Sequence, residues 1–203
     1  RCCGGRCGSW LAAAAGRWQP PRFGRRRVAP LAAAAALKPT RLRRRKAAAK
    51  LHLRLDLQTF LPACAIVEEA SHHDDTRAQQ LCANLQEGET ALFDKAYINF
   101  LHLFALNRRG VHWVTRAKDN MAFTVKKKLL KKPAGKILRD DLILLKSPKS
   151  RHQYPDPIRR VEMLVELDGK ETVMVFITNN TAWAASSVGA LYKSRWGIEV
   201  FFK

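Results

Sequence analysis

The amino-acid composition changes abruptly near Lys50, and this change limits which part of the chain can build a folded core. Arg, Ala, Gly and Pro make up 33 of the first 50 residues, and no Asp or Glu occurs among them. Such a stretch offers too little apolar periodicity to bury a core. We therefore divide the chain into residues 1–46, expected to be disordered or out of frame, and residues 47–203, expected to fold as one domain with an insertion.

Three explanations of the N-terminal segment remain open. Its four dominant amino acids have GC-rich codons and the chain begins at Arg1, so we favour a frameshift or a wrongly extended reading frame. A basic disordered DNA-binding tail and a targeting peptide are the alternatives. Under each of the three, the segment has too little apolar periodicity to build a core.

Most of the formal net charge of +20 comes from this segment. Residues 1–50 hold 14 of the 37 Lys and Arg, and the other 23, set against 17 acids, leave residues 51–203 with a net charge of +6. A basic balance indicates a polyanionic partner, most commonly nucleic acid. It carries no information about the fold.

The five cysteines do not indicate a metal centre. Cys2, Cys3 and Cys7 have no His nearby, and the spacing matches no tetrahedral zinc pattern. We interpret Cys64 and Cys82 as small core residues in a reducing compartment. No apolar run reaches the roughly 20 residues that span a bilayer, so we expect no membrane partner and a cytoplasmic protein.

After Lys50 the hydrophobic pattern alternates between the periods of strands and helices. The leucines from Leu51 to Leu57 alternate with polar residues, which predicts a half-buried strand. Further strands are expected at 63–67, 90–93, 111–115, 123–127, 137–145, 158–167 and 172–177. Helices are expected at about 74–85, capped by Asp74 or Asp75, at 97–109 and at 186–203.

Two features refine this scheme. Between about residues 118 and 170, short strands alternate with Lys-rich and Pro-bearing links, which predicts a β-rich insertion closed by an Asp168-Gly169 hairpin. The helix at 97–109 should end at Gly110 and bury one apolar stripe. That stripe comprises Ile98, Leu101, Phe104 and Ala105.

Two carboxylates stand out by position. Asp94 follows the buried strand at 90–93, where a side chain can project from the sheet edge into a cleft. Glu199 lies on the last helix, where Tyr192, Arg195 and Glu199 share a stripe roughly 60° wide beside the apolar face. Simpler interpretations exist, because Asp94 can be a cap or turn residue and Arg195–Glu199 an ordinary surface pair.

Residues 192–203 resemble the signature of DDE transposases of the insertion-sequence-four group: Tyr, two residues, Arg, three residues, Glu, six residues, Lys. The first three members, Tyr192, Arg195 and Glu199, match in type and spacing. Residues 93–97 are similar to the group's second-aspartate motif, an Asp, a basic residue, any residue and Tyr. The resemblance covers about residues 46–203.

The resemblance implies an α/β fold with a ribonuclease-H-like mixed sheet, flanking helices and a β-rich insertion between the second and third acids. It implies that three carboxylates hold two Mg²⁺ ions for phosphoryl transfer. Asp94 and Glu199 would be two of these catalytic metal ligands, and Tyr192 and Arg195 would contact DNA phosphate. The partner would be double-stranded DNA at transposon ends, and a homodimer of the intact enzyme is compatible with it.

The sequence also departs from the family pattern. No Asp or Glu precedes Asp56, so the first acid, expected on a strand before Lys50, is absent. Asp56 shares a face with His52 and Arg54 and is a poor substitute. The final Lys of the signature would fall three residues beyond Lys203. We therefore expect a transposase fragment that is inactive in DNA cleavage and transfer.

Two non-catalytic alternatives remain. A basic remnant could bind DNA through the Lys-rich run at 126–132, which would hold phosphates without reading sequence. A pseudogene product would have no function at all.

Overall fold

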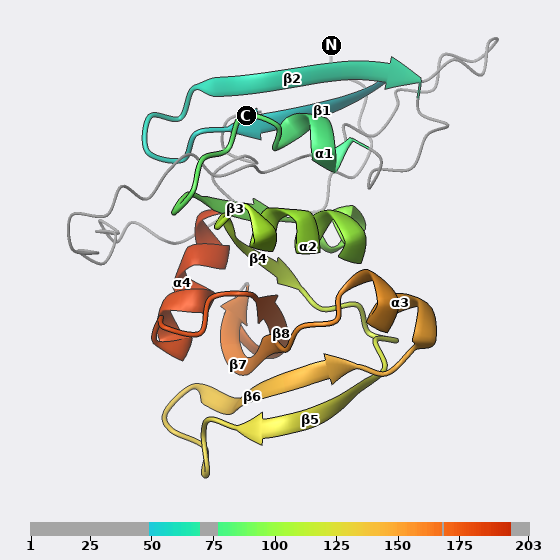
Figure 1. The fold of residues 1–203 in the computed structure, drawn as a ribbon. Helices are drawn as coiled ribbons and strands as arrows, with labels where there is room; N and C mark the ends of the chain where they lie inside the picture. Colours follow the sequence, from blue (N-terminus) through green and yellow to red (C-terminus); the bar gives the residue numbers. More distant parts are fainter. Residues whose placement is uncertain (1–48, 70–76, 168, 196–203) are drawn as a thin grey trace, which may run out of the picture.

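The structure is a computed structural model that describes residues 49–69, 77–167 and 169–195 (Figure 1). Within these residues it is a mixed α/β structure with an open mixed sheet and flanking helices, which confirms the expected fold class. None of the helices in these ranges is long and apolar enough to cross a membrane. The N-terminal segment 1–46, the predicted caps Asp74 and Asp75, and Glu199 lie outside the described residues.

Six strands form the main sheet, in the order β3-β4-β8-β7-β6-β5. Only β3 and β4 are parallel, and every other neighbouring pair is antiparallel. The strands are β3 (Thr90–Phe93), β4 (His112–Arg116), β5 (Phe123–Lys128), β6 (Ile137–Leu145), β7 (Ile158–Leu167) and β8 (Lys170–Thr178). These agree with the predicted strands. Because β8 pairs with both β4 and β7, the strands of the predicted insertion continue the same sheet.

A separate two-stranded hairpin comes first in the chain. β1 (Ala49–Leu55) pairs antiparallel with β2 (Pro62–Glu69), as expected from the two neighbouring runs. The Asp56 carboxylate begins the connecting turn by accepting the Gln58 N–H at 2.8 Å. The hairpin lies on the side of α1 and α2 (Figure 1).

The prediction that β1 is half-buried was wrong, because both of its faces are enclosed. The leucines fill one face, and His52 and Arg54 are buried on the other. The two ring nitrogens of His52 lie 2.8 Å from the Tyr97 hydroxyl and the Glu68 carboxylate, and Arg54 donates to the Leu81 carbonyl at 2.8 Å. These hydrogen bonds replace the water that His52 and the Arg54 Nη1 lose, whereas the buried Arg54 Nε has no hydrogen-bond partner among the described residues.

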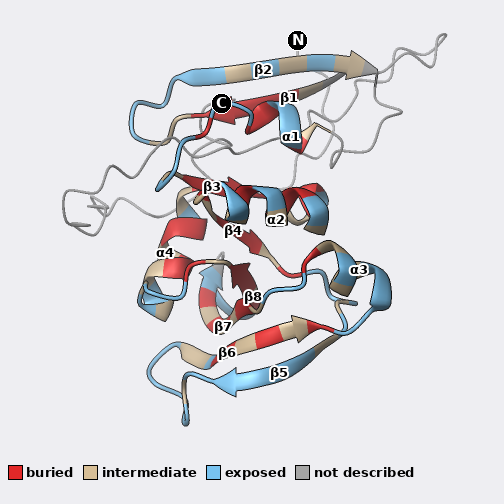
Figure 2. Cartoon of the chain, in the orientation of Figure 1, coloured by how far each residue is buried: buried red, intermediate tan, exposed pale blue. Residues whose placement is uncertain are grey.

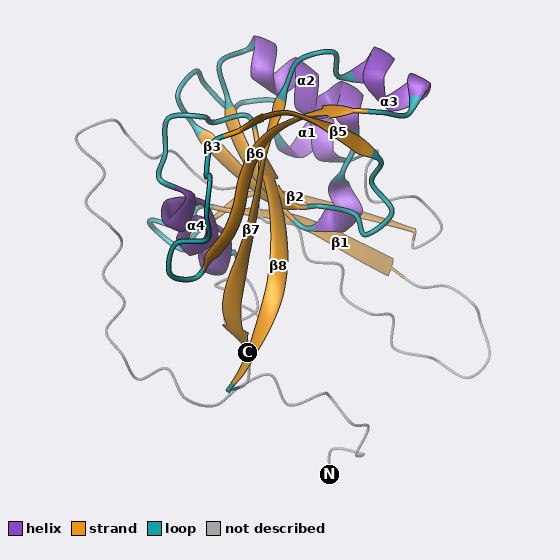
Figure 3. Cartoon of the chain, turned by 90° about the horizontal axis from the view of Figure 1, so that it is seen from below, coloured by secondary structure: helices purple, strands orange, loops and turns teal. Residues whose placement is uncertain are grey.

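Helices cover both faces of the main sheet (Figure 3). α1 (Ala78–Leu81), α2 (Phe100–Arg108) and α3 (Pro148–Gln153) lie on one face, and α4 (Ala185–Ser194) lies on the other. The strand alternation divides the core accordingly: Phe93 and Trp113 pack on the α2 side, Leu92 and Val114 on the α4 side. β3 is buried along its whole length, and further buried residues lie on β1, β4, β7, β8 and the helices, whereas β5 is exposed (Figure 2).

α2 differs from the prediction in its start and in its buried face. A 3-10 turn, η2 (Lys95–Tyr97), precedes it, and the Asn99 side chain caps it by accepting the His102 N–H at 3.2 Å. His102 is buried, whereas Leu101, predicted for the core, is 56% exposed. The predicted stripe was partly right, because Ile98 is buried and Phe104 packs against the core, whereas Leu101 and Ala105 are exposed. It counted η2 as part of the helix and so missed His102, Leu103 and Leu106, which form the buried face of α2.

The other two predicted helices are recovered in part. α1 has four residues, fewer than the predicted 74–85, although its expected apolar face is buried. That face comprises Ala78, Leu81, Cys82 and Leu85. α4 is described to Ser194, so its predicted continuation to Lys203 lies outside the described residues.

A buried ion pair fastens β6 to β7. The Arg159 guanidinium donates Nε to Asp140 Oδ1 at 2.8 Å and Nη2 to Oδ2 at 2.6 Å. Nη1 donates to the Trp183 carbonyl at 2.6 Å, which anchors the segment that leads into α4. Such a bidentate pair of hydrogen bonds between arginine and carboxylate fixes the relative orientation of the two side chains.

We predict that Asp140→Ala lowers the free energy of unfolding by about 3–5 kcal/mol, because it leaves the Arg159 charge buried without its counter-ion. Glu171→Ala is the matched control. It removes an ion pair with Lys136 whose side chains are 57% and 56% exposed, so a loss of about 0–1 kcal/mol is expected. Urea unfolding monitored by circular dichroism measures both. Equal losses in the two variants would contradict this account of the pair.

His102 gives the stability a pH dependence. Burial, with the charge of Arg109, lowers its pKa from 6.5 to about 4. Above about pH 6.5, His102 is neutral in both the folded and the unfolded chain, so its burial does not reduce the free energy of unfolding. As the pH falls toward 4, His102 becomes protonated in the unfolded chain but stays neutral in the folded protein. The free energy of unfolding therefore falls by roughly 3 kcal/mol. Comparing urea unfolding of wild type and His102→Leu across this range should show a shallower loss in the variant, and parallel curves would refute the assignment.

Candidate functional site

The candidate site lies where β3 and β4 end. Because these strands run parallel, their carboxyl ends share one edge of the sheet, the place where open α/β sheets bind ligands. Asp94 follows β3 directly, in the position expected from the sequence. Residues 117–120 follow β4 at the same edge.

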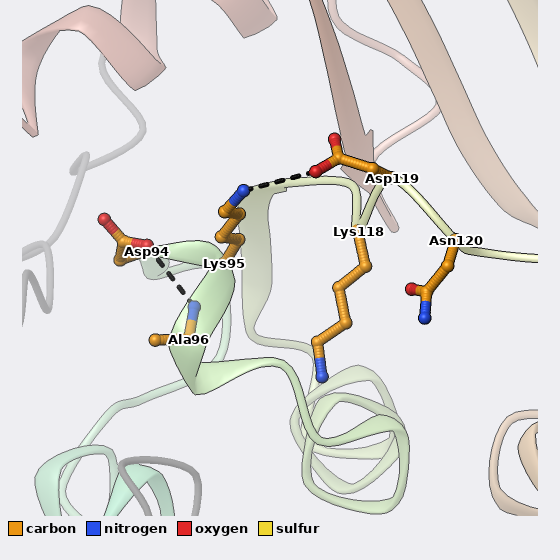
Figure 4. Close-up of a pocket in the computed structure, with 6 residues that line it drawn as sticks. All are labelled: Asp94, Lys95, Ala96, Lys118, Asp119 and Asn120. Atoms are coloured by element: carbon orange, nitrogen blue, oxygen red, sulfur yellow. Dashed lines mark hydrogen bonds and ion pairs between the residues drawn. The ribbon is translucent and has the colours of Figure 1, made fainter.

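A hollow of about 410 Å³ opens at this edge (Figure 4). The Lys95 ammonium lies 3.4 Å from the Asp119 carboxylate across it, and the Lys118 ammonium donates to the Ile98 carbonyl at 3.4 Å. The hollow therefore carries charges of both signs. The residues that line it are Asp94, Lys95, Ala96, Lys118, Asp119 and Asn120.

The Asp94 carboxylate has two different partners. Oδ1 accepts the Ala96 N–H at 3.3 Å and so caps η2, whereas Oδ2 lies 3.6 Å from Nη1 of Arg195. The side chain is 38% exposed, so it remains accessible from the hollow. Asp94 caps a turn, as the simpler interpretation expects, and it also lines the hollow.

α4 brings Arg195 to this edge from the far end of the sequence. Arg195 follows the last residue of the helix, and its guanidinium lies over the Tyr192 ring at 5.4 Å from the centroid. The side chain is 10% exposed. A charge this deeply buried needs partners to offset its lost hydration, and Asp94 and the ring supply them.

Tyr192 lies in the core, not at the edge of the apolar face where the sequence pattern placed it. It is 1% exposed, and its ring packs against Phe176 with centroids 4.9 Å apart. Burial raises the pKa of its hydroxyl, opposed by the nearby charge of Arg195. The hydroxyl is therefore neutral at physiological pH, and the part of Tyr192 nearest the site is the ring face beneath Arg195.

α4 packs closely on the sheet because Gly189 has no side chain. A Cβ at this position would collide with the thioether of Met163 on β7. A side chain at position 189 would therefore require the flexible Met163 side chain to move.

The end of β3 is also held from the opposite side. The Tyr97 hydroxyl on η2 lies 2.8 Å from the ring of His52, which in turn contacts Glu68. Arg77 donates to the same carboxylate at 2.6 Å, and this hydrogen bond lowers the pKa of Glu68. The chain of contacts ties the turn after Asp94 to the β1–β2 hairpin.

Only part of a metal site is present among the residues described. Within 49–69, 77–167 and 169–195, no group of three His, Cys, Asp or Glu side chains could share one ion. The partly exposed Asp94 carboxylate suits a hard cation such as Mg²⁺, and Asp119 offers a second carboxylate that is 87% exposed. The donor chemistry of Asp94 fits, but these ranges do not complete the ligand set. Glu199 lies outside them.

Asp119 and Asn120 were missed as site residues in the sequence. The signal was available, because they follow β4 as Asp94 follows β3, and parallel neighbouring strands bring their following residues together. Asp94 directly follows a buried strand and belongs to a recognisable motif, whereas no such motif marks residues 119–120.

Comparison with known proteins agrees with the motifs. The family model described as Transposase DDE domain matches residues 32–203. A candidate transposase of Sinorhizobium fredii is 28% identical over 157 residues, 76% of this chain and 43% of the relative. A candidate transposase for the insertion sequence element IS5377 of Geobacillus stearothermophilus is 27% identical over 160 residues, 78% of this chain and 40% of the relative.

The chain thus spans less than half the length of these curated relatives. The family match, in contrast, covers most of the chain, including all of the strands and helices described above. It includes the segment with Asp94 and the segment with Tyr192 and Arg195. The chain therefore belongs to the transposase DDE domain family.

Proposed function

We propose that this chain is part of the catalytic domain of a DNA transposase. In the whole enzyme, that domain would cleave and join DNA strands with the help of divalent metal ions. The observation that carries the proposal is the contact between Asp94 and Arg195, 3.6 Å apart at one end of the sheet. Two motifs that stand far apart in the sequence supply these side chains. An acid beside an arginine at the rim of an open hollow suits phosphate chemistry.

Within the family we assign the chain to the insertion-sequence-four group, with a ribonuclease-H-like core. The spacing of Tyr192, Arg195 and Glu199 supports this group, as does the order Asp94, Lys95, Tyr97. The parallel pair β3–β4, with Asp94 at its carboxyl end, is compatible with such a core. We propose residues 47–203 as the catalytic domain, with the β-rich region at about 118–170 as its insertion.

We further propose Asp94 and Glu199 as two of three Mg²⁺ ligands. Bound Mg²⁺ supplies an activated attacking oxygen and stabilises the leaving oxygen during phosphoryl transfer. Glu199 follows Arg195 by four residues, about one helical turn, so a continuing helix would keep both on one side. Oxygen donors on a strand end and on a helix form the kind of ligand set that hard cations prefer.

Arg195 acts on the DNA in this proposal. Its guanidinium offers paired N–H donors that match a phosphate, while the Tyr192 ring supports it from the buried side. Without DNA the same guanidinium lies against Asp94. Tyr192 then contributes to DNA binding mainly by holding Arg195. The partner we propose is double-stranded DNA at transposon ends, with a homodimer as the assembly of the whole enzyme.

The first acid of the triad has no counterpart in this sequence. Residues 1–55 contain no Asp or Glu, and Asp56 is engaged in the turn of the β1–β2 hairpin. Removing one preorganised polar group from an active site commonly costs several kcal/mol of barrier. We therefore propose that the chain alone retains the site architecture and does not cut DNA.

We predict that Mg²⁺ or Mn²⁺ stabilises the protein through Asp94. At a cation concentration about ten times the dissociation constant, stabilisation is roughly 1.4 kcal/mol, or a few degrees in melting temperature. Asp94→Asn should abolish this shift. Asp156→Asn, at an exposed aspartate elsewhere, is the control and should keep it. A cation-induced shift that persists in Asp94→Asn would exclude Asp94 as a ligand.

We predict no Mg²⁺-dependent nicking of duplex oligonucleotides carrying transposon ends, measured by denaturing gel electrophoresis of labelled strands. The reason is the missing first acid, which should leave the attacking oxygen misplaced. Nicking that requires Mg²⁺ and disappears in Asp94→Asn would overturn the claim of inactivity and support the assignment of Asp94. Nicking that persists in Asp94→Asn would point to a contaminating nuclease.

A further inference from the structure

A row of positive charge occupies the outer edge of the main sheet. β5 is last in the strand order and, among the described strands, pairs only with β6. From residue 120 to residue 139 the sequence has no Asp or Glu. The same stretch contains the basic residues Lys126, Lys127, Lys128, Lys131, Lys132, Lys136 and Arg139.

Five of these lysines are exposed and lack an ion pair with any described acidic residue; we name them the lysine edge. Figure 2 shows β5 exposed along its length. Of the acids nearest in the pairing, Asp140 is bound by Arg159, and Asp141, although it is the cross-strand neighbour of Lys128, is buried and forms no ion pair with a described lysine. The lysine edge comprises Lys126, Lys127, Lys128, Lys131 and Lys132.

The geometry of the lysine edge suits a linear polyanion. Three of the five lysines lie on β5, and Lys131 and Lys132 lie just beyond it. Side chains of a regular strand alternate between its two faces, so residues two apart stand about 6.6 Å apart on one face, close to twice the rise of about 3.4 Å per nucleotide along one DNA strand. Pairing with β6 shifts register between Val125 and Lys127, and such a bulge re-aims side chains locally. Lysines on edge strands also discourage strand-to-strand association, but a single charge can fill that role.

We propose that the lysine edge is a second DNA-binding surface, which holds the sugar–phosphate backbone of a duplex without reading its sequence. The choice of DNA as the polyanion rests on the proposed function. β5 lies five strand spacings from β3, roughly 24 Å across the sheet at about 4.8 Å each. The surface is therefore separate from the hollow at Asp94, and it secures DNA through counterion release rather than catalysis.

Salt-dependent binding of the full chain to a fluorescent random-sequence duplex tests this surface. The test variant carries Lys126→Gln, Lys127→Gln and Lys128→Gln. Each phosphate contact contributes about 0.9 to the slope of log affinity against log salt, so the slope should become shallower by about 2 to 3. Fluorescence anisotropy at several salt concentrations gives the slope directly.

A matched control variant distinguishes DNA binding at the lysine edge from binding that depends only on the net charge of the protein. Lys146→Gln, Lys149→Gln and Lys170→Gln remove the same charge from exposed positions outside the lysine edge. This control should change the slope by less than about 0.9, the contribution of one phosphate contact. Equal changes in the two triple variants would overturn the proposal, because binding would then follow net charge alone.

Chemical acetylation of the unmodified protein provides a readout that does not depend on variants folding. With duplex DNA bound, mass spectrometry should show protection of the lysine edge but not of Lys146, Lys149 and Lys170. Protection of neither group would contradict the proposal. Vesicles of anionic phospholipid form the second arm, and stronger protection by vesicles than by DNA would assign the surface to membranes and overturn it.

The outcome is distinguishable from that of the proposed function. If the metal response at Asp94 fails while the lysine edge still binds duplex, the catalytic proposal fails and this inference stands. If the metal response holds while the slope is unchanged in the test variant, only this inference fails.

Discussion

The contact between the Arg195 guanidinium and the Asp94 carboxylate is the interaction on which the candidate site depends. It joins the end of β3 to the end of α4 and so fixes the two elements that carry the family motifs. Asp94 supplies a counter-charge that helps to offset the hydration lost by the largely buried guanidinium. The Tyr192 ring below and the Ala96 N–H beside Asp94 complete the arrangement.

The surrounding fold holds this contact in place from three directions. Gly189 allows α4 to pack closely on β7, and the Arg159–Asp140 pair anchors the segment before α4 through the Trp183 carbonyl. On the other side, Tyr97 and His52 tie the turn after Asp94 to the hairpin. The site thus rests on packing and on buried hydrogen bonds, while Lys95 and Asp119 of the hollow are exposed to solvent.

The strands were predictable from sequence, because alternation and short apolar runs such as that of β3 report burial directly. Asp94 was predictable because a strand precedes it and a motif contains it. The buried faces of β1 and α2 were not, since His52, Arg54 and His102 enter the core through particular partners or packing that no periodicity reveals. Likewise, Asp119 joins the hollow only through the parallel pairing of β3 with β4.

Iron-directed cleavage of the polypeptide tests most directly whether Asp94 and Glu199 share a metal ion. Fe²⁺ that replaces Mg²⁺ generates hydroxyl radicals in the presence of ascorbate and peroxide, and these cut the backbone beside the bound metal. Our account predicts fragments ending near residues 94 and 199 that disappear when excess Mg²⁺ competes. Cuts elsewhere, or cuts that Mg²⁺ does not suppress, would contradict a shared metal site.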